Sequence, residues 1–372
     1  MPKLSSYTAA STITGEESIP LIQRGANVLG VTRDFHPYDY VIDARTDAQA
    51  GTSLLNAISD LTSAGEGGEI KIMAGAVNLG TTKLTIPNGV TVRGVATGWR
   101  STAALSLGTR LYWTGDTTSS CIDITGHGSG LVDMSIFAAA THAGNIVAVQ
   151  GGVDGSKGSV LERLRITGGP SSTTLWGLAI YDAYHTDVRG VNLDVFMNGM
   201  IIDTVSNPYN VGNSMYSDVF VFQNFDNTTG IKISSPSLTQ RTNLMTFNQC
   251  GSICNPGIGT GCTALMLRGA SRLTFNGVDL ENHEVLLDMG IGGGNGPTSH
   301  NTFINSYLNS TTYGLKNVVC DATSTNNTFI GGWMIVPSAQ SSELQYDLTK
   351  GTSDPNYYYH VKKSSAGYFT EA

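Results

Sequence analysis

A recurring Thr-Phe pair is the feature that most constrains the fold of this chain. The pairs stand at residues 246–247, 274–275, 302–303 and 328–329, and their spacings are 28, 28 and 26 residues. Asn, Gly and β-branched residues surround each pair, as is typical of short strands between tight turns. A repeat of this length indicates a stack of units, each of which buries its apolar face against the next. The sequence therefore predicts an all-β solenoid, a right-handed single-stranded parallel β-helix.

The same pattern extends upstream and gives each repeat a second strand. The apolar centres of the expected second strands are Ile122, Val147, Leu178, Ile201, Ile231, Leu265, Leu286 and Val318, and those of their partners are Met134, Leu164, Val191, Val219, Phe247, Phe275, Phe303 and Phe329. Local alternation, as in Ile122-Asp-Ile124, places one side chain inward and the next outward. We expect about eight coils over residues 91–340. A β-sandwich is the alternative, but sandwiches do not keep a 28-residue period.

Composition and charge exclude several classes of protein. Only 13% of the 372 residues are charged, the net charge is −8, and no basic cluster indicates a nucleic-acid partner. The sequence contains no run of 18 apolar residues, so it predicts no membrane-spanning helix. The odd number of cysteines argues against a disulfide framework, and Cys121 and Cys320 fit a core. Cys250, Cys254 and Cys262 lack a fourth ligand at zinc-site spacing, so we expect no metal and no cofactor.

The first 33 residues form a separate segment with too few apolar residues to fold alone. Their line Ile13-Thr-Gly-Glu-Glu-Ser-Ile-Pro-Leu-Ile-Gln23-Arg-Gly resembles the N-terminal adaptor of many bacteriophage tail fibres and tailspikes. The resemblance implies virion attachment through Thr14, Gly15, Glu16, Pro20 and Gln23, with other phage tail proteins as partners. An ordinary extended tail is the alternative. With no signal peptide, the protein is expected to be made in the host cytoplasm and carried in the virion.

Residues 34–90 are expected to connect this segment to the β-helix and to cover its first coil. Leu54, Leu55, Ile58 and Leu61 share one face of a helix expected at about 52–64, capped by Thr52 or Ser53 and ended by Gly65. This helix, followed by the line Thr-Ile-Pro-Asn-Gly-Val-Thr-Val-Arg-Gly94, resembles the start of pectate-lyase-like phage tailspikes. The acidic Gly-Asp-Gly line usual before that helix is replaced by Asp43-Ala-Arg-Thr-Asp, which makes this chain a distant relative.

The period stops near residue 340, and residues 341–372 form an aromatic-rich C-terminal cap or tail. Such a tail suits the covering of the last coil or contact with sister chains. Tailspikes of the resembled family are usually homotrimers, so the resemblance implies a homotrimer here.

A candidate catalytic site stands in the segment Val278-Asp-Leu-Glu-Asn-His-Glu284. Asp279 and Glu281 share one face of a strand, with Cα atoms roughly 6.5–7 Å apart, because Leu280 between them points inward. Glycoside hydrolysis needs two exposed carboxyl groups at about 5–9.5 Å. Glu284 follows at the turn. The sequence therefore predicts Asp279, Glu281 and Glu284 as catalytic residues, with two solvated acids on an outer strand as the alternative.

A second cluster, Asp182, Tyr184, His185 and Asp187, lies near Trp176 and is the candidate substrate-binding set. Aromatic faces pack on sugar rings and carboxylates bind hydroxyl groups, although a plain surface turn has the same composition. By the coil count this cluster lies about three coils, or ~14 Å, from Asp279. The two clusters therefore do not form one catalytic pair within a chain.

Two functional hypotheses remain. The first is a phage tailspike that recognises a host cell-surface polysaccharide and depolymerises it, as a glycoside hydrolase in preference to a lyase. The second is a non-enzymatic structural or receptor-binding β-helix of the virion. Whether the protein is an enzyme stays open, because the carboxylates are sparse. A secreted lyase would require the signal peptide that the chain lacks.

Overall fold

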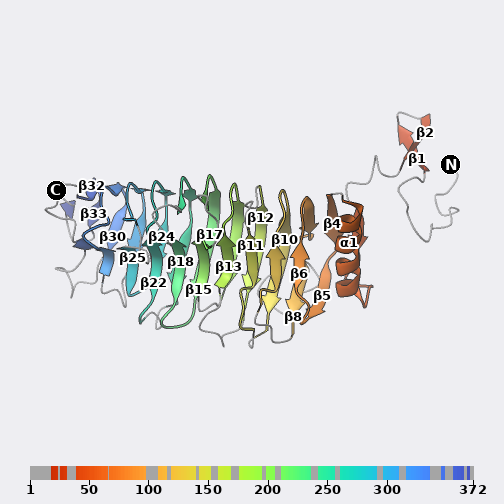
Figure 1. The fold of residues 1–372 in the computed structure, drawn as a ribbon, viewed down its shortest axis with the longest axis horizontal. Coiled ribbons are helices and arrows are strands. Elements are labelled where there is room, and N and C mark those ends of the chain that lie inside the picture. Colours follow the sequence, from red (N-terminus) through yellow and green to blue (C-terminus); the bar gives the residue numbers. More distant parts are fainter. Residues whose placement is uncertain are drawn as a thin grey trace.

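The computed structural model describes residues 18–23, 26–31, 39–65, 67–97, 108–114, 119–139, 142–151, 158–168, 176–194, 198–205, 211–235, 242–255, 260–290, 296–309, 316–335, 345–347, 355–363 and 367–368. The predicted β-helix is confirmed. Figure 1 shows a long stack of coils whose strands run across the long axis, with a helix over one end. Within the described residues no helix is long and apolar enough to cross a membrane.

Three parallel sheets run along the stack, and all but the terminal coils contribute a strand to each. The first sheet contains β3 (Tyr40–Ile42), β4 (Gly68–Ile72), β7 (Val90–Arg93), the first halves of β10 (Gly130–Ala138), β12 (Val160–Thr167), β14 (Asp187–Asp194) and β17 (Met215–Gln223), then β20 (Thr246–Asn248), β23 (Thr274–Asn276), β26 (Thr302–Ile304), β29 (Thr328–Ile330) and β32 (Tyr357–Tyr359).

The second sheet continues from the first around a corner. It contains β5 (Gly75–Gly80), β8 (Thr109–Trp113), the second halves of β10, β12, β14 and β17, then β21 (Gly251–Cys254), β24 (Asp279–Glu281), β27 (Tyr307–Asn309), β30 (Trp333–Ile335) and β33 (Lys362–Lys363). A short strand, β34 (Gly367–Tyr368), pairs antiparallel with β33.

The third sheet has ten strands in chain order. They are β6 (Leu84–Ile86), β9 (Ile122–Ile124), β11 (Val147–Gln150), β13 (Trp176–Tyr181), β15 (Asn198–Asp203), β18 (Thr229–Ser234), β22 (Thr263–Arg268), β25 (Val285–Gly290), β28 (Lys316–Cys320) and β31 (Gln345–Asp347). The eight strand centres predicted for this sheet all lie on β9 to β28. A further parallel pair, β16 (Val211–Gly212) with β19 (Thr242–Asn243), lies outside the three sheets.

From β10 onward, the corner between the first and second sheets is made by one residue per coil in the left-handed backbone conformation. These residues are Asp133, Arg163, Gly190, Asp218, Gln249, Gly277, Asn305, Gly331 and His360, with φ between 49° and 66°. Each follows the last paired residue of the first sheet, so they form one column along the stack. We name this set the left-handed column. Because αL geometry turns the chain within a single residue, the two sheets meet without a loop.

The recurring Phe residues fill the interior as predicted. Six rings stack in register from Tyr216 through Phe247, Phe275, Phe303 and Phe329 to Tyr358, with centroids 4.6–4.8 Å apart. The central members are almost fully buried. The 28-residue spacing therefore reports one coil per repeat, because each Phe lies one strand spacing from its predecessor.

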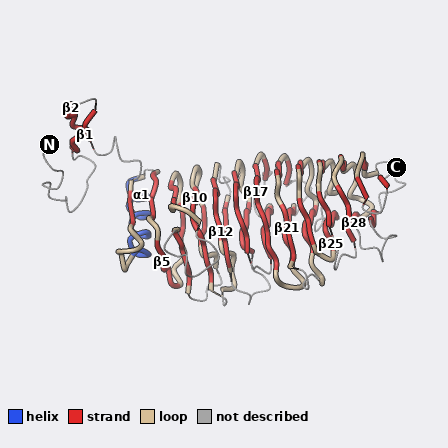
Figure 2. The backbone as a smooth tube through the Cα atoms, turned by 180° about the vertical axis from the view of Figure 1, so that it is seen from behind, coloured by secondary structure: helices blue, strands red, loops and turns tan. Residues whose placement is uncertain are grey.

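Helix α1 (Ala50–Ala64) covers the open first coil with Leu54, Ile58 and Leu61, and Figure 2 shows it in blue at the end of the stack. Gly65 ends it in the left-handed conformation, as predicted. The predicted start is wrong. Gln49 is the N-cap and makes no side-chain cap, while the Ser53 hydroxyl donates to Asp47 at 2.6 Å. Asp47 therefore anchors the first turn from outside the helix.

The stack is longer than residues 91–340. Strands β4, β5 and β6 already pair with the following coil, and β31, β32 and β33 continue the sheets beyond residue 340. Near the N-terminus, β1 (Ser18–Gln23) and β2 (Ala26–Val31) form an antiparallel hairpin. Pro20 and Gln23 lie on β1, whereas Thr14, Gly15 and Glu16 lie outside the described residues.

Candidate functional site

The predicted acid pair lies on the outer face of the second sheet. Asp279 and Glu281 are the two half-exposed residues of β24, and Leu280 between them is buried at 2% exposure. The outward orientation of both acids is thus confirmed. In register, Asp279 lies between Gly251 and Tyr307, and Glu281 lies between Ile253 and Asn309. The side chains of three adjacent coils therefore surround the pair.

Glu281 influences the protonation of Asp279. Partial burial, then the charge of Glu281 and a hydrogen bond with it, raises the pKa of Asp279 to about 6. Burial and the charges of Glu281 and Asp279 also raise the pKa of Tyr307. Oδ1 of Asp279 is buried and has no hydrogen-bond partner within the described part of the chain. Asp279 can therefore hold a proton near neutral pH and keeps an unused polar atom.

Aromatic rings flank the acid pair on both sides along the same face. Phe220 leans over Gly251, where a Cβ would lie 2.9 Å from the Phe220 ring, so the glycine opens the space beside Asp279. On the other side stand Tyr307 and then Trp333, which is 44% exposed and lies 4.2 Å from the Lys362 ammonium. Phe220 and Trp333 are four coils apart, or ~19 Å. We name Phe220, Asp279, Glu281, Tyr307 and Trp333 the acid–aromatic band.

Glu284 does not join the pair. It lies in the turn between β24 and β25, where its Oε2 accepts a hydrogen bond from the Gly261 amide at 2.5 Å and fixes the neighbouring loop. His283 beside it points into the core. Its ring contacts Gln223 Oε1 at 2.6 Å and Ser252 Oγ at 3.2 Å, and burial lowers its pKa to about 4. The structure therefore brings together two of the three acids predicted as catalytic.

The predicted substrate-binding cluster forms the turn from the third sheet to the first. Asp182 is buried with φ 52°, and its Oδ1 accepts the Val205 amide at 2.9 Å. Asp187 forms an ion pair with Arg189. The amide of exposed His185 donates to Gly212 O at 3.2 Å, and Tyr184 is half-buried. These contacts organise the turn, and the role of these residues in binding stays a prediction.

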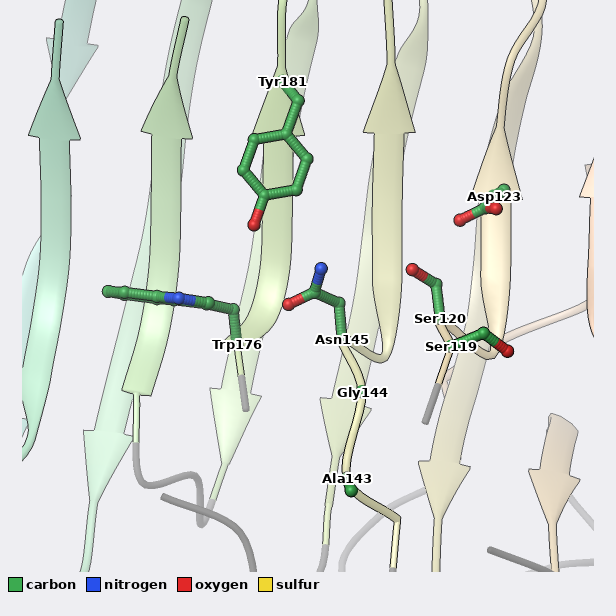
Figure 3. Close-up of a pocket in the computed structure, with 8 residues that line it drawn as sticks. All are labelled: Ser119, Ser120, Asp123, Ala143, Gly144, Asn145, Trp176 and Tyr181. Carbon is green, nitrogen blue, oxygen red and sulfur yellow. The ribbon is translucent and has the colours of Figure 1, made fainter. Parts of the chain in front are cut away.

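Trp176 lies apart from that turn, in a hollow on the outer face of the third sheet. Figure 3 shows the hollow, of about 430 Å³, with residues from three successive coils around it. Its lining comprises Ser119, Ser120, Asp123, Ala143, Gly144, Asn145, Trp176 and Tyr181. Sequence reasoning missed this set, because its members are up to 62 positions apart and the intervening loops differ in length.

No other chemistry stands out among the described residues. All five cysteines are free and buried, and no group of three or more His, Cys, Asp or Glu residues could hold a metal ion in that part of the chain. Cys254 and Cys262 hydrogen-bond to each other, which lowers the pKa of Cys262 to about 6, but both are buried. Outer acids and aromatic rings are the groups available to a ligand.

No protein-family model matches the sequence, and no curated protein matches it. The A-module of the Azotobacter vinelandii mannuronan C-5 epimerase AlgE6 is similar in structure, with 9% identity, a TM-score of 0.52, and coverage of 88% of this chain and 100% of that one. ORF18 of Geobacillus virus E2 has 11% identity, a TM-score of 0.50, and coverage of 86% and 68%.

A third similar structure is the tailspike protein gp49 from the Acinetobacter baumannii bacteriophage Fri1, a capsular polysaccharide depolymerase. It has 14% identity and a TM-score of 0.44, and the match covers 97% of this chain and 69% of that one. The structural neighbours thus include phage proteins and a polysaccharide-epimerase module. At these identities the likeness shows the fold alone, which is the parallel β-helix that the repeat predicts.

Proposed function

We propose that this chain is a phage tailspike that binds a host cell-surface polysaccharide along the outer face of its second sheet. The observation that carries the proposal is the acid–aromatic band, in which rings from Phe220, Tyr307 and Trp333 flank two acids on one continuous face. The polarised C–H faces of sugars pack on aromatic rings, and carboxylates accept sugar hydroxyl groups. Rings spaced at multiples of the coil rise suit an extended polymer.

Hydrolysis of that polysaccharide is a second candidate function, favoured by the protonation of Asp279. A carboxyl group with a pKa of about 6 can donate a proton to a glycosidic oxygen near neutral pH. The neighbouring Glu281 would then act as the second carboxyl group, which activates water or stabilises the developing positive charge. Negative charge on this acid pair disfavours the carboxylate of a uronic acid. We therefore propose a neutral sugar at the point of cleavage, and a hydrolase in preference to a lyase.

Virion attachment and trimer formation complete the proposal. The resemblance of residues 1–33 to phage adaptors supports attachment through this segment, and the hairpin β1–β2 lies within it. The homotrimer is supported by the family resemblance. In this arrangement the β-helix presents its outer sheets to the host surface.

The experiment that tests the proposal is incubation of the purified protein with capsule or lipopolysaccharide from candidate hosts, with binding, reducing ends and unsaturated products all recorded. Binding that weakens in Trp333→Ala supports recognition by the band. New reducing ends without unsaturated products support hydrolysis. Unsaturated products would contradict the hydrolase and indicate a lyase. Binding with neither product would make the protein a non-enzymatic adhesin, and no binding to any candidate would overturn the proposed function.

A further inference from the structure

The shape of the hollow on the third sheet is determined by small residues at its floor and by two aromatic side chains. Gly144 packs so closely on the preceding coil that a Cβ there would lie 2.2 Å from Ser119 O, and Ala143 beside it is also small. Trp176 and Tyr181 pack against Ala148, Ala179 and Ile201, which point outward yet are buried. Small residues thus lower the surface, and two aromatic rings stand over it.

The polar groups in the hollow are aligned but not all used. The Tyr181 hydroxyl points toward the Asn145 amide in Figure 3, and a hydrogen bond joins the two side chains. Asp123 accepts a hydrogen bond from Lys83 at 2.8 Å through Oδ2. Its Oδ1 is buried and has no hydrogen-bond partner among the described residues. A buried acceptor without a partner is unfavourable, so a ligand that donates a hydrogen bond to it would be stabilised.

We propose that this hollow is a second carbohydrate-binding site, which holds one or two neutral sugar units and takes no part in cleavage. Its volume of about 430 Å³ lies within the range of about 300–1,000 Å³ found for ligand sites. Trp176 offers a face for the sugar ring, and Asp123, Asn145 and Ser120 offer partners for hydroxyl groups. Lys83 pairs with Asp123, and the charge of Lys232 acts on Asp203, so the acids near the hollow are largely compensated and the hollow suits a neutral sugar.

This site is separate from the acid–aromatic band. It lies on another sheet, and β13 and β24 are four coils apart, or ~19 Å along the axis. A long polysaccharide held at both places would bind more tightly than at either one, because the second contact forms at a high effective concentration. The inference rests on a carbohydrate ligand, as does the proposed function, but it concerns different residues.

The test titrates the full-length protein with neutral sugars, namely galactose, N-acetylglucosamine and oligosaccharides from the bound polysaccharide, with glucuronic acid as the anionic comparison. The chain has four tryptophans, and their fluorescence reports binding. We expect the fluorescence change on addition of neutral sugars to be smaller in Trp176→Phe than in wild type, because the contribution of Trp176 is lost, whereas Trp333→Phe retains that contribution. We expect the Trp176→Ala variant to bind about tenfold more weakly, with cleavage of short oligosaccharides unchanged.

Asp123→Asn provides a second variant, because it retains the shape of the side chain but removes the carboxylate charge and replaces one acceptor oxygen by an NH₂ group, which cannot accept a hydrogen bond. It should also weaken binding, while the melting temperature stays near that of wild type. Unchanged affinity in both Trp176→Ala and Asp123→Asn, with the wild type binding sugar, would overturn the second site and leave the proposed function standing. If binding is lost in Trp333→Ala but is unchanged in Trp176→Ala and Asp123→Asn, the second site is likewise overturned and the proposed function stands. A wild type that binds no sugar would overturn both.

Discussion

The side-chain amide of Asn301 donates to Oδ1 of Asn327, one coil further along the stack, at 2.9 Å. Asn327 repeats the contact with Oδ1 of Asn356 at 3.0 Å, and each of these oxygens also accepts a backbone amide of the preceding coil. All three residues are buried. The asparagine side chains therefore accept the hydrogen bonds of backbone amides at a turn where, within the described residues, no neighbouring strand provides an acceptor.

Replacing Asn327 by Ala should destabilise the fold by about 1–3 kcal/mol, because it leaves the buried backbone amide of Asn301 without an acceptor and removes one of the two acceptors of the Asn301 side-chain amide. Chemical denaturation followed by circular dichroism measures this change. The matched control is Asn276→Ala, since Asn276 is exposed on the outside of β23. Equal effects in the two variants would contradict the importance of the asparagine ladder.

Replacing Phe275 by Ala should destabilise the fold by about 3–5 kcal/mol, because it leaves a cavity in the interior. The ring of Phe275 now stacks between those of Phe247 and Phe303, at centroid distances of 4.8 Å and 4.7 Å. The midpoint of denaturation gives the value. Ile330→Ala removes an apolar side chain that is 41% exposed and should change stability little. A near-neutral Phe275→Ala would be inconsistent with an uninterrupted interior stack.

Asp279→Asn should stabilise the protein at pH 8 and should leave stability unchanged at pH 3.5. The folded-state pKa of Asp279 is about 6 against an ordinary value of 3.8, so the folded state binds the proton more tightly. The stabilisation from this proton is complete below 3.8 and is lost as pH rises through 6. Thermal melting at both pH values tests the sign. Together with Glu281→Gln, the substitution should abolish any glycan cleavage.

His283 should make the protein less stable in acid. Its folded-state pKa is about 4 against an ordinary value of 6.5, so the unfolded chain binds the proton more tightly. Its contribution is present above pH 6.5 and is lost as pH falls toward 4. Because Asp279 acts in the opposite direction in an overlapping window, the comparison belongs in an Asp279→Asn background. There His283→Gln should flatten the dependence of melting temperature on pH between 6.5 and 4.

Deletion of residues 1–33 should leave a folded, β-rich protein that no longer attaches to virions. The reason is that the β-helix has its own end cover in α1, whose Leu54 and Leu61 pack on the first coil. Circular dichroism and co-sedimentation with virions check the two halves of the prediction. Loss of folding on deletion would contradict the adaptor role.

The sequence predicts those parts of the fold that repeat in register. Phe247, Phe275, Phe303 and Phe329 could be aligned because the same residue returns at the same inward position, and Leu280 could be placed inward by alternation. The start of α1 could not, since its first turn is held by Asp47, which lies outside the helix. Local propensity favoured Thr52 or Ser53 as the cap, but a tertiary contact decided otherwise.

The candidate sites divide in the same way. Asp279 and Glu281 are two residues apart on one strand, so their common face follows from the pleat alone. The hollow requires Asp123, Asn145 and Trp176 to meet from three coils, and the loops between these coils are of unequal length. One signal was present in the sequence: Ala148 and Ala179 occupy outward positions where neighbouring strands have larger side chains such as Ile201 and Lys232. Small outward residues mark where a solenoid surface is lowered.

The left-handed column has a consequence for how such a protein can change over time. Its nine positions hold six residue types, including Arg163, Gln249 and His360, because the bend depends on backbone geometry and not on any one side chain. Mutation along this edge can therefore alter charge and shape while the sheets on either side keep their alignment. The left-handed column is therefore a part of the surface that can vary in sequence without a change in the packing of the interior.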